Sequence, residues 1–190
     1  MTLTRDSIDP AGKAVLLHTT AGDIAVYLYP DLAPNHVRNF LYLVQRGFYD
    51  GVGFHRIVEN FVVQAGQPRP DWTEPVPALQ AEFSDTPHTT GTLAAARTSD
   101  PNSATSQFYL VLSRTHAKHL DNQYTVFGQA FEGLDVLQRI ADNWADKVRT
   151  LDDRRADRVE SDDRIVSAEV VDRGPYEESI AAFREQTGVR

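Results

Sequence analysis

The feature that most constrains the fold of this chain is a series of short apolar runs separated by glycine and proline. Residues 15–20 and 24–29 predict two strands joined by a short turn, as in an antiparallel hairpin. In the second run Ile24, Val26 and Leu28 share one face, because side chains alternate along a strand. Further strands are predicted at residues 54–58, 61–65, 92–96, 107–112, 125–130 and 165–171.

Only two stretches have the spacing of a long helix. The first follows Pro34, which suits the first turn of a helix, and its apolar positions are Val37, Phe40, Leu41 and Val44. The second is marked by Leu134, Leu137 and Ile140. Residues 67–90 are rich in proline without a sustained period, so they predict a long surface loop. The whole pattern favours a mainly-β fold, an antiparallel barrel or sandwich with helices covering its ends.

Composition excludes several classes of protein. The 190 residues suit one domain with a substantial core. A net charge of −8 disfavours a nucleic-acid-binding protein, which needs a basic face to neutralise phosphates. No apolar run approaches the ~20 residues that cross a bilayer, and the amino terminus lacks a signal-peptide stretch, so we expect no membrane partner. Because cysteine is absent, disulfides and thiol nucleophiles are excluded. Together these features predict a cytoplasmic protein, which we also expect to be a monomer.

Charge and composition divide the chain into a leader, one domain and a tail. Residues 1–12 predict a flexible leader, and residues 13–174 the domain. Inside the domain, residues 142–164 carry dense and nearly balanced acidic and basic side chains, which is typical of a solvated insertion. Residues 175–190 predict a tail whose apolar positions have the spacing of a small docked helix.

An arginine inside an apolar run stands out from this pattern. Arg56 shares a strand face with Phe54 and Val58, and half-burying its permanent charge is costly unless the protein uses it. The alternative is structural: Arg56 pairs with a carboxylate such as Glu59, and the aromatic residues nearby are ordinary core. From this segment alone both interpretations stay open.

Several motifs follow one another along the chain: Phe54-His55-Arg56-Ile57, Asn60-Phe61, Gln64, Gly91-Thr92-Leu93-Ala94, Ser106-Gln107-Phe108 and Val126-Phe127-Gly128. In this order and spacing they resemble the signature of the cyclophilins, a family of peptidyl-prolyl cis-trans isomerases. The resemblance runs from residue 13 to 141 and resumes at 165–174. It implies a closed eight-stranded antiparallel barrel capped by two α-helices, and an activity that needs no cofactor and no metal.

The resemblance also implies a role for each matched residue. Arg56 would be the catalytic arginine, donating a hydrogen bond to the nitrogen of a rotating X–Pro bond. The proline pocket would consist of Phe61, Val62, Tyr109 and Leu120, to which the aromatic pattern adds Phe108. The peptide groove would be lined by Gln64, Ala96, Arg97, Gln107, His119 and Tyr124. The partners would be proline-containing peptides and unfolded protein segments, and the function would be assistance to protein folding.

Departures from the family pattern keep a second hypothesis open. Val62 stands where the family usually has methionine, and Tyr109 replaces a phenylalanine and brings a hydroxyl to the pocket. A proline-peptide-binding or chaperone module with weak catalysis would keep the same groove. A third hypothesis is an interaction role for the charged segment 142–164. His116 and His119 lack a third ligand at a recognisable spacing, so they are interpreted as surface or groove histidines rather than a metal site.

Overall fold

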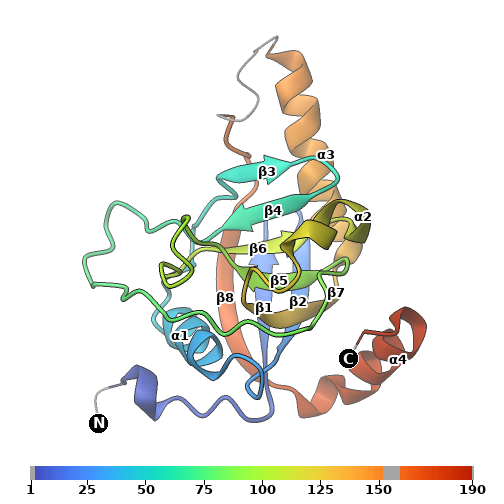
Figure 1. Ribbon diagram of the computed structural model, residues 1–190. Coiled ribbons are helices and arrows are strands. Elements are labelled where there is room, and N and C mark those ends of the chain that lie inside the picture. Colours follow the sequence, from blue (N-terminus) through green and yellow to red (C-terminus); the bar gives the residue numbers. More distant parts are fainter. Residues whose placement is uncertain (1–2, 152–158, 190) are drawn as a thin grey trace.

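The computed structural model describes residues 3–151 and 159–189. Its strands are Lys13–Thr19 (β1), Gly22–Leu28 (β2), Arg56–Val58 (β3), Val62–Ala65 (β4), Thr92–Ala95 (β5), Phe108–Val111 (β6), Val126–Glu132 (β7) and Ile165–Asp172 (β8). They form one eight-stranded sheet in the order β3-β4-β6-β5-β7-β2-β1-β8 (Figure 1). All neighbouring strands are antiparallel. Each strand overlaps one of the predicted runs, so the mainly-β prediction is confirmed.

The two edge strands, β3 and β8, are linked where the residues before β3 meet the start of β8. The Gly51 N–H donates to the Ile165 carbonyl at 2.7 Å, and the Ile165 N–H donates to the Val52 carbonyl at 2.8 Å. Gly53 and Arg164 form an isolated antiparallel bridge beside these bonds. The molecule is therefore a curled sheet whose edges meet at this short contact, rather than a barrel closed by a full ladder between β3 and β8.

The described residues form four α-helices beside the sheet: Pro34–Gln45 (α1), Arg114–Ala117 (α2), Leu134–Thr150 (α3) and Glu177–Thr187 (α4). Single 3-10 turns lie at Arg5–Ser7 (η1), Lys118–Leu120 (η2) and Gly174–Tyr176 (η4). The two predicted long helices are α1 and α3, and α4 lies in the predicted tail. Figure 1 shows α3 extending past β3. In the part of the chain that the structure describes, no helix has both the length and the apolar character to cross a bilayer.

Side-chain alternation along the strands creates two apolar layers. On β6, Leu110 faces an inner layer, where it is buried with Phe40 of α1 and Ile140 of α3. Its neighbour Tyr109 faces an outer layer, which includes Phe183 of α4. The same short strand therefore supplies both the core and the outer face, and a ligand can reach the strand side chains only where helices leave the outer layer open.

The charged segment predicted as a solvated insertion, residues 142–164, is in part helical and buried. α3 covers its first part, where Trp144 is only 8% exposed. The Trp144 indole donates from Nε1 to the Val159 carbonyl at 2.7 Å. Trp144 extends the apolar stripe that begins at Leu137, and burial of this stripe holds the helix despite its charged neighbours. Residues 152–158 of the predicted insertion lie outside the described residues.

The predicted flexible leader, residues 1–12, also contacts the domain. Ile8 is 6% exposed and belongs to the inner apolar layer. Arg5 donates from Nε to Asn39 Oδ1 at 2.7 Å, and its guanidinium lies 4.4 Å from the centre of the Tyr42 ring. This part of the leader is therefore packed against α1, and the first two residues lie outside the described residues.

A carboxylate from the loop predicted at residues 67–90 holds the start of α1. Ala33, which precedes the helix, offers no capping side chain. Instead, Glu82 accepts hydrogen bonds from the N–H groups of Asn35 and His36 at 3.1 and 3.0 Å. No helical carbonyl can accept these N–H groups, and a negative charge is favourable at a helix N-terminus. The loop is therefore fastened to the helix that covers the inner layer.

We expect Glu82→Ala to lower the free energy of unfolding by about 1–2 kcal/mol, because two N–H groups of α1 lose their acceptor. Urea denaturation at neutral pH measures this loss. Glu82→Gln is the matched control, since it removes the charge and one of the two acceptor oxygens but keeps the other, and it should lose less. Equal stability of Glu82→Ala and the parent protein would contradict this account of the helix start.

Candidate functional site

Cross-strand pairing places predicted site residues in one row on the outer face of the sheet. Arg56 of β3 is paired with Gln64 of β4, and Gln64 is paired with Tyr109 of β6. Tyr109 is in turn paired with Ala94 of β5. Directly paired residues of an antiparallel sheet point to the same face. The register therefore brings a cation, an amide and an aromatic ring side by side.

Arg56, Gln64 and Tyr109 belong to a groove of about 480 Å³. It is lined by Arg56, Phe61, Val62, Gln64, Ala96, Arg97, Tyr109, His119, Leu120 and Tyr124. Gln107 lies next to it in a side pocket of about 230 Å³. The groove and the side pocket share Gln64, Ala96 and Arg97. The structure thus brings together every residue predicted for the site except Phe108.

The prediction that Phe108 lines the proline pocket is wrong. Phe108 is 1% exposed and belongs to the inner layer. Its ring centre lies 5.5 Å from those of both Phe40 and Tyr49. Since Phe108 precedes Tyr109 on β6, alternation sends the two rings to opposite faces of the sheet. Phe108 supports the site only as part of the core beneath it.

Arg56 is exposed, which corrects the expectation that it is half-buried among apolar side chains. It lies on β3, an edge strand. Glu59, the suggested structural partner, instead lies 3.6 Å from Arg149. Within the described residues, the only side-chain hydrogen bond of Arg56 joins Nη1 to Gln64 Oε1 at 3.4 Å, which is long for such a bond. The guanidinium therefore keeps N–H groups for a ligand.

A chain of hydrogen bonds orients the amide beside Arg56. His55 Nε2 lies 3.1 Å from Gln107 Oε1, and the same oxygen accepts from Gln64 Nε2 at 2.9 Å. Burial lowers the pKa of His55, so the neutral ring donates through its Nε2–H. Because the NH₂ group of Gln64 is engaged with Gln107, its Oε1 is left to face Arg56.

Apolar and aromatic side chains form the floor and walls of the groove. The floor consists of buried side chains, Val62, Tyr109 and Leu120. Phe61 stacks against His119 with ring centres 5.3 Å apart. On the other side, the Arg97 guanidinium lies 4.4 Å from the centre of the Tyr124 ring. Such a lining accepts an apolar ring and excludes water from it.

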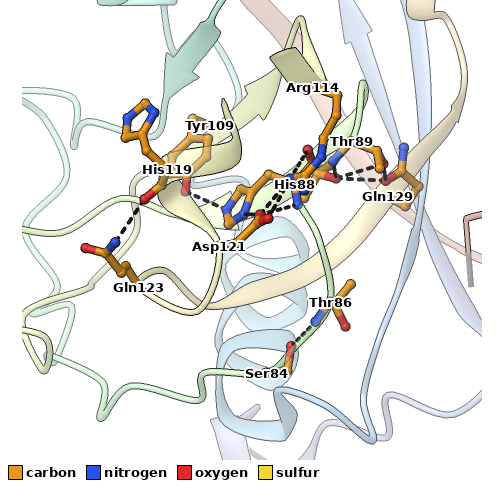
Figure 2. A network of polar contacts seen from close by, with 11 residues as sticks. Ser84, Thr86, His88, Thr89, Tyr109, Arg114, His119, Asp121, Gln123 and Gln129 are labelled. Carbon is orange, nitrogen blue, oxygen red and sulfur yellow. Dashed lines mark hydrogen bonds and ion pairs between the residues drawn. The ribbon is translucent and has the colours of Figure 1, made fainter. Parts of the chain in front are cut away.

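Behind the groove, the Tyr109 hydroxyl joins a polar network (Figure 2). It lies 3.0 Å from His88 Nε2, and His88 Nδ1 lies 3.0 Å from Asp121 Oδ1. Arg114 Nη1 lies 2.8 and 2.7 Å from the two oxygens of that carboxylate. The ring that forms the pocket floor is therefore anchored by a chain of polar groups.

Burial decides where the protons of this network lie. It raises the pKa of Tyr109 and lowers the pKa of His88. Neutral His88 therefore donates its Nδ1–H to Asp121 and accepts the Tyr109 hydroxyl proton on Nε2. Burial opposes the charge of Asp121, but hydrogen bonds from the His88 backbone N–H and from Arg114 hold its pKa below the ordinary value. Tyr109 thus directs its proton to His88 and presents its ring to the groove.

The sequence patterns do not identify His88, Asp121 or Arg114 as part of the site. His88 lies in a loop without a period, Arg114 begins α2, and Asp121 follows η2. The one available signal is Tyr109 itself, because a buried hydroxyl requires a hydrogen-bond partner. That signal requires a polar group behind the pocket but does not say which residue supplies it.

Comparisons with known proteins agree with this geometry. Residues 14–170 match the family model described as "Cyclophilin type peptidyl-prolyl cis-trans isomerase/CLD". "Peptidyl-prolyl cis-trans isomerase 9" of Schizosaccharomyces pombe is 38% identical over 141 residues, covering 72% of this chain and 23% of that protein. A "Probable peptidyl-prolyl cis-trans isomerase" of Brucella suis is 37% identical over 150 residues, covering 72% and 75%. A Cryptosporidium parvum cyclophilin-type isomerase, crystallised in the presence of the dipeptide Ala-Pro, has a TM-score of 0.69 at 23% identity, covering 83% of this chain and 98% of that one.

We expect the protein to lose stability as the pH falls below 6.5, the ordinary pKa of histidine. Burial lowers the folded-state pKa of His36, His55 and His88. Below pH 6.5 these histidines therefore become protonated in the unfolded chain but stay neutral in the folded protein. Proton uptake by the unfolded chain lowers the free energy of unfolding. Urea denaturation between about pH 7.5 and 5.5 measures this slope, in a range above the ordinary pKa of carboxylates.

His88→Gln tests the share of this slope that comes from the network. The variant removes one histidine that stays neutral in the folded protein. The slope of its free energy of unfolding against pH should therefore be shallower by up to about 1.4 kcal/mol per pH unit. His116→Gln, which replaces an exposed histidine, is the matched control and should keep the parental slope. The same slope in both variants would show that His88 is not buried as a neutral ring.

Proposed function

The chain belongs to the cyclophilin-type peptidyl-prolyl cis-trans isomerase family, and we propose that it accelerates the rotation of X–Pro bonds in the groove on the outer face of its sheet. The observation that carries this proposal is the row of Arg56, Gln64 and Tyr109 across three adjacent strands. It sets a permanent hydrogen-bond donor beside an apolar cup of the kind that suits a proline ring.

Rotation of an X–Pro bond breaks no covalent bond, and its barrier of roughly 18–20 kcal/mol comes from lost amide conjugation. In the twisted state the proline nitrogen becomes pyramidal and basic. A donor aimed at that nitrogen stabilises the twisted state more than either planar state, which is the condition for catalysis. Arg56 can act as that donor, because its guanidinium stays protonated and keeps N–H groups for a ligand.

The two glutamines act through position rather than through proton transfer. Gln64 directs its Oε1 at the Arg56 guanidinium because its NH₂ group is held by Gln107. Gln107 uses its Oε1 for both His55 and Gln64. Its own NH₂ group has no hydrogen-bond partner among residues 3–151 and 159–189, so it is left to bind a backbone carbonyl of the substrate.

The substrates we propose are proline-containing peptides and unfolded protein segments, so that the protein assists folding. The Cryptosporidium parvum isomerase of the same fold was crystallised in the presence of Ala-Pro, which supports proline-containing peptides as the ligands. The side pocket beyond Ala96 and Gln107 lengthens the groove along an extended chain. A cytoplasmic location and a monomeric state stay predictions from the sequence.

We expect Arg56→Ala to lower kcat/KM by about a hundred- to a thousandfold, the size of the loss when one transition-state donor is removed. Exchange NMR on a short Ala-Pro peptide measures the isomerisation rate directly. Arg46→Ala is the matched control, since Arg46 forms a surface ion pair with Glu74 outside the groove, and it should keep the parental rate.

Equal rates in Arg56→Ala and the parent protein would overturn the mechanism. The same experiment separates the enzyme from a proline-peptide-binding or chaperone module. Chemical-shift changes at Val62 and Tyr109, without faster exchange between the peptide isomers, would assign the groove to binding alone.

A further inference from the structure

Although the protein is acidic overall, with a net charge of −8, its groove is lined by basic side chains. Arg56 and Arg97 both line the groove, and within the described ranges no aspartate or glutamate lines it or the side pocket. Neither arginine has a carboxylate within ion-pair distance among the described residues, whereas Arg114 behind the groove is paired with Asp121. A substrate that enters the groove therefore meets uncompensated positive charge.

Arg97 is held in place by neutral groups. Its Nε and Nη2 donate to the Gln123 carbonyl at 3.1 and 2.8 Å. Its Nη1 donates to the Thr98 carbonyl at 2.8 Å and to the Ser99 carbonyl at 3.4 Å. The Tyr124 ring lies beneath the guanidinium at 4.4 Å. The carbonyl groups and the Tyr124 ring orient the Arg97 guanidinium without neutralising its charge. Because the side chain is already ordered in the free protein, a ligand loses little binding free energy in fixing its rotamer.

Asp100 and Asp121 do not neutralise Arg97. Asp100 accepts a hydrogen bond from the Asn102 N–H at 2.9 Å and forms no ion pair with Arg97 in the described part of the chain. Asp121 is engaged by Arg114 and by His88. Of the five N–H groups of Arg97, the four hydrogen bonds to carbonyls leave one on Nη2 for an incoming acceptor.

Arg97 also lies where a substrate must pass. It lines both the groove and the side pocket, together with Gln64 and Ala96. Consider a peptide that places its proline ring in the cup over Tyr109 and extends into the side pocket. The residue adjacent to its proline then crosses the boundary between the groove and the side pocket, where Arg97 lies. The side chain of that adjacent residue is therefore the part of the substrate that Arg97 can reach.

We propose that Arg97 is a specificity-determining residue that makes the groove prefer X–Pro segments with an acidic side chain adjacent to the proline. The inference rests on the isomerase function proposed above and narrows its substrate class. An aspartate or glutamate in that position pairs with a pre-oriented cation, whereas a lysine or arginine meets two like charges. Because the boundary is open to solvent, the preference is modest and decreases with salt.

The test compares kcat/KM within two pairs of short peptides. The members of each pair differ only in having Glu or Gln next to proline, before the proline in the first pair and after it in the second. Exchange NMR at low ionic strength measures both pairs. In the parent protein we expect the Glu peptide of one pair to be favoured by about two- to fivefold, the size of an exposed charge pair. Adding about 0.5 M NaCl should reduce this ratio towards one.

Arg97→Gln should bring the Glu-to-Gln ratio close to one, while Arg46→Gln, outside the groove, should keep the parental ratio. Circular dichroism confirms that both variants are folded. Equal use of Glu and Gln peptides in both positions by the parent protein would overturn the proposal, and so would a preference that survives in Arg97→Gln. Activity on the Gln peptides tests the isomerase function separately, since an absence of turnover on every peptide would instead refute that function.

Discussion

The register of β3, β4 and β6 is the constraint on which the site depends. Arg56, Gln64 and Tyr109 come from three strands that are separate in the chain, yet they are direct cross-strand neighbours. Side chains alternate along a strand, so a shift of one residue in either pairing would point the side chain of Arg56, Gln64 or Tyr109 towards the core. The inner layer fixes the register, since Ile57, Val63 and Leu110 are all buried there.

This arrangement separates the two demands on the site, exposure for the donor and rigidity for the cup. Arg56 lies on an edge strand, so its guanidinium reaches solvent and a substrate without a large desolvation cost. Tyr109 lies on β6 between two other strands and is fixed from behind by His88. A solvent-exposed donor beside a fixed wall suits a reaction in which only the substrate amide rotates.

The sequence predicted the strands, the two long helices and most of the groove, because alternation and motif spacing are local signals. The aromatic pattern, read without counting alternation, placed Phe108 in the pocket, although its neighbour Tyr109 faces the groove and Phe108 the core. The charged composition around Trp144 predicted a solvated segment. Burial of this one large ring is enough to pack the helix against the core, although many of its neighbours are solvated. The contact of His88 with Tyr109 joins positions 21 apart in the chain, so it depends on tertiary folding that no local pattern encodes.

The most direct test of the account is a double-mutant cycle on kcat/KM with Arg56→Ala and Gln64→Ala, measured by exchange NMR on an Ala-Pro peptide. If Gln64 contributes by holding the Arg56 guanidinium, Gln64→Ala lowers the rate in the parent protein and has no further effect once Arg56 is removed. The account predicts that the double variant is as active as Arg56→Ala alone. Losses that multiply in the double variant would contradict it, because the two side chains would then act independently.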